Sequence, residues 1–313
     1  MPNKSGTLCL HVAALNGHVK VVKTLIQKGT PVDAQTKDGY TALHLSVLQN
    51  RPDIIQTLLG YGAEVDLKGG ASMETPLHIA ARLPDGLRSA EMLLKSGASV
   101  NETTEETGES PLHITARNGY LDLLKMLLAE GADATQVSKH GETALHLAVR
   151  HCHYDIAKAL IMFVKDNRSV REAANLVNVP NNEGETCLHL GGELGKSQAH
   201  HPFEDVDMIR LLLENGADNL SVTKLTTETP LHYCARAGNN EILQEIVWQM
   251  GVNFQSACNR QARNGWSPLM TACEQGHSTI AEILLRNNAR VDVFDEHGKA
   301  ALHLGKFVFK MTI

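Results

Sequence analysis

A Leu-His pair that returns about every 33 residues constrains the fold of this chain more than any other feature. The pair occurs eight times, and Leu269-Met270 stands where a further pair would fall. A fixed period in this range is typical of arrays in which each repeat buries its apolar face only against its neighbours. The 313-residue chain is therefore predicted to be a repeat array rather than a set of globular domains. The pairs begin at Leu10, Leu43, Leu77, Leu112, Leu145, Leu188, Leu231 and Leu302.

Each repeat is predicted to contain two short helices. In seven of the nine repeats Ser or Thr stands two residues before the leucine, as at Thr41 and Thr75, where its hydroxyl can cap a helix N-terminus. Four repeats follow it with Pro, as at Pro76, in the first helical position. Aliphatic residues then recur at helical spacing, for example in residues 123–128. Neither helix can bury its apolar side alone, so we expect the pairs to stack.

The period, together with TPLH at Thr75–His78 and Thr229–His232, resembles the ankyrin repeat. The resemblance implies an all-α ankyrin-repeat solenoid with about eight full helix-turn-helix units, a truncated ninth and short hairpin loops. A single array is expected over residues 1–304, followed by a non-repeat tail at 305–313. Its repeats are expected to start near residues 6, 39, 73, 108, 141, 184, 227, 265 and 298.

Three lengthened repeats and the two ends depart from this pattern. The extra residues lie at 164–179, 195–205 and 250–262, and we expect them to form surface loops, since loop growth is well tolerated. Terminal repeats of a finished array present a polar outer face, which neither end of this sequence has. We therefore expect a segment of a longer array or a truncated product.

The charge balance and the cysteines narrow the class of protein. With 35 acidic against 29 basic residues the net charge is −6, which argues against nucleic acid or an anionic membrane as a partner held by charge. The longest apolar run has about six residues, too short for a transmembrane helix. Six scattered cysteines without a disulfide spacing indicate reduced thiols and a cytoplasmic location.

No pattern in the sequence predicts an enzyme, a cofactor or a metal. Eight of the sixteen histidines are the repeat histidine, each in a different layer, and the resemblance implies a structural hydrogen-bonding role for them. Residues 151–153 (His-Cys-His) lack a second cluster at zinc-ligand spacing. Gly195-Lys196-Ser197 ends like a phosphate-binding loop but has no matching first glycine. We predict no catalytic, cofactor-binding or metal-binding residues.

Two kinds of residue are candidates for binding a protein partner. An arginine stands five residues after the repeat leucine in four repeats, and two interpretations are open. The favoured one is a positive charge that complements the helix dipole, and the other is a positive stripe that docks an acidic segment. Aromatic residues at two hairpin tips are the second kind, because exposed aromatics are effective anchors. The candidates are Arg82, Arg117, Arg150, Arg236, Tyr40 and Trp266.

Several stretches carry more identity than the repeat requires, at residues 37–47, 58–63, 231–240 and 289–295. They resemble the middle of the N-terminal ankyrin arrays of NOMPC-type (TRPN-class) mechanotransduction channels. The resemblance implies a cytoplasmic tether or gating spring between a cation channel's pore and microtubules, with the membrane domain outside this chain. The alternative is a freestanding or truncated adaptor that binds protein partners on its concave face. The identity of the partner and the oligomeric state stay open between these hypotheses.

Overall fold

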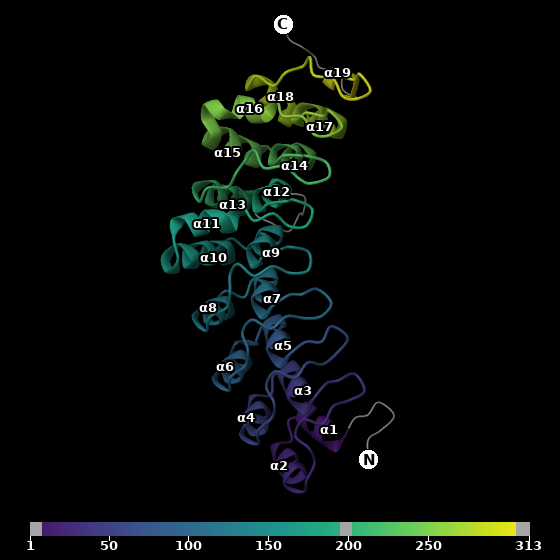
Figure 1. Cartoon of the computed structure of the whole chain (residues 1–313), viewed down its shortest axis with the longest axis vertical. Coiled ribbons are helices and arrows are strands. Elements are labelled where there is room, and N and C mark those ends of the chain that lie inside the picture. Colours follow the sequence, from purple (N-terminus) through teal and green to yellow (C-terminus); the bar gives the residue numbers. More distant parts are fainter. Residues whose placement is uncertain (1–7, 195–201, 305–313) are drawn as a thin grey trace. The chain divides into compact units, whose positions relative to one another are not determined.

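The computed structural model describes residues 8–194 and 202–304 of the chain. Within these ranges the regular secondary structure is helical, apart from one isolated antiparallel bridge between Gly69 and Glu74. Short helices follow one another in pairs joined by extended loops (Figure 1). The all-α repeat fold predicted from the sequence is confirmed. The chain forms two compact parts, residues 1–144 and 145–313, and a single array over 1–304 stays a prediction.

In the N-terminal part the helices form an inner and an outer layer. Each inner helix packs on its own outer partner and on the next inner helix, as α1 does on α2 and α3. The inner helices are α1 (Cys9–Leu15), α3 (Ala42–Leu48), α5 (Pro76–Arg82) and α7 (Pro111–Asn118). The outer helices are α2 (Val19–Gln27), α4 (Pro52–Gly60), α6 (Leu87–Lys95) and α8 (Leu121–Ala129).

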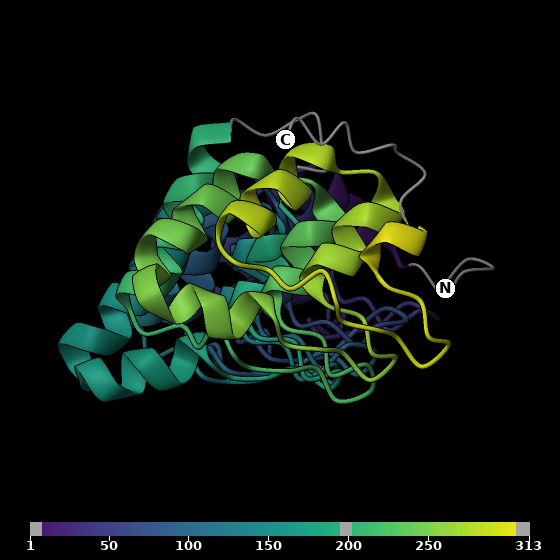
Figure 2. The ribbon, with the colours of Figure 1, turned by 90° about the horizontal axis from the view of Figure 1, so that it is seen from above.

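The C-terminal part repeats this plan, and its connecting loops gather on one side of its helices (Figure 2). Its inner helices are α9 (Ala144–Arg150, whose first residue ends the N-terminal part), α12 (Cys187–Gly192), α14 (Pro230–Ala237), α17 (Pro268–Gln275) and α19 (Ala301–Leu304). Its outer helices are α10 (Tyr154–Asn167), α13 (Pro202–Glu214), α15 (Asn240–Met250) and α18 (Ser278–Arg286). Three additional elements are α11 (Val170–Val177), the 3-10 helix η1 (Gly251–Asn253) and α16 (Phe254–Cys258).

Two of the three insertions are helical, which corrects the expectation of surface loops. The first lengthens α10 and adds α11, whose Ala173, Leu176 and Val177 are buried. The third forms η1 and α16, which bury the ring of Phe254. The apolar residues of these insertions recur at helical spacing, and their burial stabilises structure that a loop would lack. The second insertion falls largely on residues 195–201, outside the described residues.

Small residues allow neighbouring inner helices to pack closely. The repeat leucines from Leu10 to Leu269 are at most about 1% exposed, whereas Leu302 in the incomplete repeat is 76% exposed. In α12 the usual alanines are replaced by Gly191 and Gly192. A Cβ at Gly192 would stand 2.9 Å from the carbonyl oxygen of Pro230 in α14. The two glycines therefore permit a backbone contact that a larger residue would prevent.

In five repeats the histidine joins its own repeat to the next one. In α3 the backbone N–H of Thr41 donates to Nδ1 of His44, and the Thr41 hydroxyl lies 2.8 Å from the same nitrogen. A ring whose Nδ1 accepts carries its proton on Nε2, and this N–H donates to the carbonyl oxygen of Glu74 in the following repeat at 3.1 Å. The structural role implied by the ankyrin resemblance is therefore confirmed for this histidine. His78, His113, His189 and His232 repeat the arrangement.

Buried histidines make the stability of the fold dependent on pH. Burial lowers the pKa of His44, His78 and His232 from 6.5 to about 4. The unfolded chain therefore binds more protons than the folded chain between pH 6.5 and 4. This contribution to stability is complete above pH 6.5 and is lost as the pH falls toward 4. Between these pH values the free energy of unfolding should change by up to about 1.4 kcal/mol per pH unit for each histidine.

Urea unfolding at pH 7.5, 6.5 and 5.5 measures this pH dependence. The exposed tip residue His140 provides a control, because His140→Gln should keep the whole pH dependence while His78→Gln should lose its share. A midpoint that does not change between pH 7.5 and 5.5 would contradict the assignment.

Candidate protein-binding surface

The four arginines that are candidates for binding a partner all lie in the last turn of an inner helix. Their side chains are between a third and about half exposed. A positive charge at this point of a helix complements the dipole, as the favoured interpretation expects. The structure adds that each of these arginines also forms an ion pair.

A glutamate that the sequence analysis did not single out is the partner of each arginine. Arg82 pairs with Glu74, and Arg117 pairs with Glu109, eight residues earlier in the same repeat. Arg236 pairs with Glu228 in the same way and approaches Glu193 at 4.0 Å. The carboxylates are largely buried in the loop just before the helix cap. The spacing Glu-x7-Arg was present in the sequence and could have revealed these pairs.

Three of the paired glutamates, Glu74, Glu109 and Glu228, also take part in the histidine bridge. The backbone carbonyl of Glu74 accepts the hydrogen bond from His44 of the preceding repeat, while its carboxylate binds Arg82 of its own repeat. The arginine charge is therefore used inside the fold. A stripe of uncompensated positive charge is absent at these ion-paired positions, and a partner role for the arginines stays a prediction.

In the N-terminal part, Arg117 lies near two charged residues of the adjacent repeats, Glu142 and Arg82. Burial lowers its pKa, Glu142 opposes this effect, and the positive charge of Arg82 adds to it. The positive charge of Arg82 in one repeat therefore influences the pKa of Arg117 in the next repeat.

In the C-terminal part a tyrosine completes a similar network. The Tyr233 hydroxyl donates to Glu185 at 2.8 Å, and Glu185 lies 4.0 Å from Arg150. Burial and this hydrogen bond raise the pKa of Tyr233, so the hydroxyl stays protonated. The guanidinium of Arg236 lies 5.1 Å from the centre of the Tyr233 ring, within cation–π range.

The two aromatic residues at the hairpin tips are half-buried, so the expectation that they are exposed is wrong. The hydroxyl of Tyr40 would stand 2.3 Å from a Cβ on Gly70, which places its ring over the glycine of the next hairpin. Trp266 donates from Nε1 to Asp295 of the next hairpin at 3.3 Å. Both rings therefore pack one loop on another, and only their remaining surface is available to a partner.

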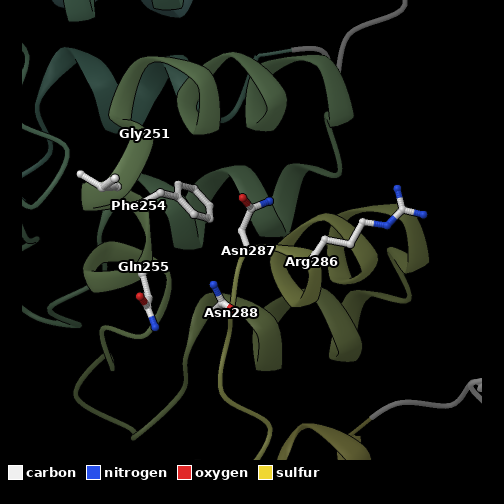
Figure 3. Close-up of a pocket in the computed structure, with 7 residues that line it drawn as sticks. Gly251, Phe254, Gln255, Arg286, Asn287 and Asn288 are labelled. Atoms are coloured by element: carbon white, nitrogen blue, oxygen red, sulfur yellow. The ribbon is translucent and has the colours of Figure 1, made fainter.

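Two shallow grooves of the C-terminal part offer other contact surfaces. One, of about 280 Å³, lies at the hairpin tips and is lined by Leu225, Glu228 and Arg263 among others. Leu225 is 73% exposed, and no motif in the sequence indicated it as a binding residue. The other, of about 240 Å³, lies between η1–α16 and the end of α18 (Figure 3). There the side chain of Arg286 extends away from Asn287 and Asn288.

The tip groove combines an apolar side chain with a positive charge. The backbone N–H of Arg263 donates to the carbonyl of Thr226 at 2.7 Å, which holds the two hairpins together. Within residues 8–194 and 202–304 no ion pair engages the exposed Arg263 side chain. Glu228 connects the groove to Arg236, one of the predicted residues. The exposed Glu296 also lines the groove, so the groove presents an apolar side chain beside charges of both signs.

Among the residues that the structure describes, no three His, Cys, Asp or Glu side chains are grouped so that they could hold a metal ion. None of the helices described is long and apolar enough to span a membrane. The six cysteines are free thiols, and burial raises the pKa of Cys234 to about 12, which makes that thiol a poor nucleophile.

Comparison with known proteins assigns most of the chain to one family. The family whose sequence model matches residues 1–69, 77–170 and 232–305 is described as "Ankyrin repeats (3 copies)". A second model, "Ankyrin repeats (many copies)", matches residues 197–244.

Curated relatives of the chain are diverse. The chain is 30% identical over 288 residues to the ankyrin repeat and KH domain-containing protein mask-1 of Caenorhabditis elegans, covering 88% of this chain and 10% of that protein. It is 26% identical to the E3 ubiquitin-protein ligase KEG of Arabidopsis thaliana, covering 99% of this chain and 18% of that protein. It is 25% identical to a Caenorhabditis elegans homologue of transient receptor potential cation channel subfamily A member 1, covering 62% and 14% respectively. The chain thus spans less than a fifth of the length of each of these relatives.

The buried ion pairs can be tested by truncating one partner. Arg117→Ala leaves the carboxylate of Glu109 buried without its cation, and we expect a loss of about 1–3 kcal/mol in the free energy of unfolding. The matched control is Arg286→Ala, which breaks an exposed pair with Glu282 and should cost at most about 0.5 kcal/mol. Urea unfolding of both variants measures the difference, and equal losses would contradict a structural role for Glu109.

Proposed function

The chain belongs to the ankyrin-repeat family, and from that premise we propose that it acts as a non-enzymatic protein-binding scaffold without a cofactor. It works on the cytoplasmic side of the membrane and contacts its partner with the hairpin tips of the C-terminal part. The observation that carries this proposal is the tip groove, where Leu225 is 73% exposed beside Arg263. Exposed apolar surface at a groove is one of the features that mark a protein-interaction site.

The relatives support the scaffold more than any single activity. Their names describe a KH-domain protein, a ubiquitin ligase and a cation channel. Proteins so different in function share the repeat array with this chain, so the array is best explained as their common means of contacting other proteins.

Substitutions in the groove test the proposal. A photo-crosslinking amino acid at position 225 of the full chain should identify the partner by mass spectrometry. Leu225→Asp should then weaken binding of that identified partner at least about tenfold, because an apolar anchor is lost and a charge is buried. The control Val170→Asp alters a side chain on α11 that is 66% exposed, and it should change affinity less than about twofold. Binding that Leu225→Asp leaves unchanged, or that Val170→Asp abolishes, would contradict the groove as the interface.

A second candidate function is the tether of a mechanically gated channel of the TRP type, linking it to microtubules or other cytoskeleton. One observation favours it: a relative matched over 62% of this chain is named as a homologue of a transient receptor potential cation channel. Because each described helix packs mainly on its neighbours, a load applied at the ends would act on many interfaces in series. Such a chain would be compliant under tension.

Pulling on the full chain by optical tweezers tests the tether. We expect reversible extension followed by stepwise loss of repeats. Gly192→Val should lower the force of one step, because its side chain would meet the Pro230 carbonyl where α12 packs on α14. Gly60→Val, at a helical glycine of α4 with no neighbouring atom within 4 Å of a Cβ, controls for the cost of a β-branched residue in a helix. A single abrupt rupture of the wild-type chain would exclude the elastic role.

A further inference from the structure

We propose that the outer face of α2 is a docking surface for an acidic polypeptide segment of a partner protein. The basic face of α2 consists of Lys20, Lys23, Lys28 and the neighbouring Arg51, all exposed. It lies on the outer layer of the N-terminal part, so it is a second surface, separate from the tip groove. The proposal goes beyond the proposed function and does not depend on it.

The sequence around α2 reverses the charge of the whole chain. The chain has a net charge of −6, yet its first acidic residue is Asp33. The outer helices α4, α6, α8, α10, α13, α15 and α18 each carry at least one acidic residue, whereas α2 carries none. A local basic block therefore exists, although the overall acidic balance conceals it.

The lysines of α2 stand where other repeats have a favourable charge pattern. The second residue is acidic in α4, α8, α10 and α15, for example Asp122 in α8, and a carboxylate there interacts well with the helix dipole. In α2 the same position is Lys20. In α13 the acidic residue Asp207 pairs with Arg210 three residues later at 2.7 Å. In α2 the corresponding residues are two lysines, Lys20 and Lys23, which repel each other.

No neighbouring group of the described structure compensates these charges. No ion pair joins Lys20, Lys23 or Lys28 to a carboxylate within residues 8–194 and 202–304, Asp53 of the adjacent α4 included. The side chain of Arg51 passes over Gly17, where a Cβ added to the glycine would lie 3.5 Å from it. Arg51 therefore adds a further positive charge near the start of α2. Because Lys20 and Lys23 do not stabilise the helix, their placement is explained by a partner that carries the opposite charge.

The packing of α2 favours a polypeptide over a membrane as that partner. A helix that binds a membrane surface inserts its apolar side into the lipid. In α2 that side faces the protein, because Val22 is fully buried and Leu25 and Ile26 are half-buried. Only Val21, 47% exposed, remains outside among the lysines. The face therefore offers charge with little apolar area, which suits an extended acidic segment.

Binding of a fluorescein-labelled oligoglutamate peptide to the full chain tests the proposal by fluorescence anisotropy. We expect binding that weakens with added salt, since exposed charges are screened. The variant Lys20→Glu/Lys23→Glu should bind at least about tenfold more weakly. The control Lys125→Glu/Lys158→Glu makes the same change in net charge on α8 and α10, where an acidic residue is already present, and it should bind within about twofold of wild type.

Four further outcomes decide against the proposal. Equal weakening by both double variants would show attraction to net charge alone. Absence of peptide binding by the wild type, or sedimentation with phosphatidylserine vesicles without peptide binding, would assign the face to another role. Thermal melting separates binding from folding: glutamate at the second position of α2 suits the helix dipole, so the Tm of Lys20→Glu/Lys23→Glu should not fall. A lower Tm would indicate that the lysines are structural.

Discussion

The interaction on which the structure depends is the hydrogen bond from a buried, neutral histidine to the next repeat. The ring accepts from the backbone and hydroxyl of its own helix cap and donates to a carbonyl of the following loop, as His232 does to Trp266. A buried donor left without its acceptor would destabilise the fold, so each ring fixes the position of the next loop. The repeat leucines belong to the buried apolar core, while the histidines link successive repeats by hydrogen bonds.

The sequence predicted the repeated part of this arrangement because the same residues recur in register. Helix caps, proline at the first helical position and buried leucines were all visible in the period, and the structure confirms the helix pairs. The insertions were less predictable, since only one copy of each exists and a short apolar pattern fits either a loop or a helix. Burial of Phe254 and Leu176 decided for helices.

The candidate site was less predictable than the fold, because exposure depends on the neighbouring repeat. Tyr40 was expected to be exposed, yet the glycine opposite it in the next hairpin leaves room for the ring to pack. The arginines were considered alone, although a glutamate eight residues earlier neutralises charge at the same place. Leu225 gave no signal because a single exposed leucine in a loop looks the same in sequence as a buried one.

In a repeat array, the residues that serve the fold can be recognised by comparing equivalent positions within one chain. The ion pair between Glu109 and Arg117 recurs in other repeats, so its charges are explained by the stability that the pair gives to the fold. Lys20 does the opposite: it replaces the acidic residue that most other outer helices place near the positive end of the dipole. Leu225 likewise exposes a large apolar side chain at a position where most other repeats hold a polar or charged residue. A residue that departs from the repeat pattern at a cost to the stability of the fold indicates a contact with another molecule. The groove and α2 contain such residues, whereas the paired arginines follow the pattern.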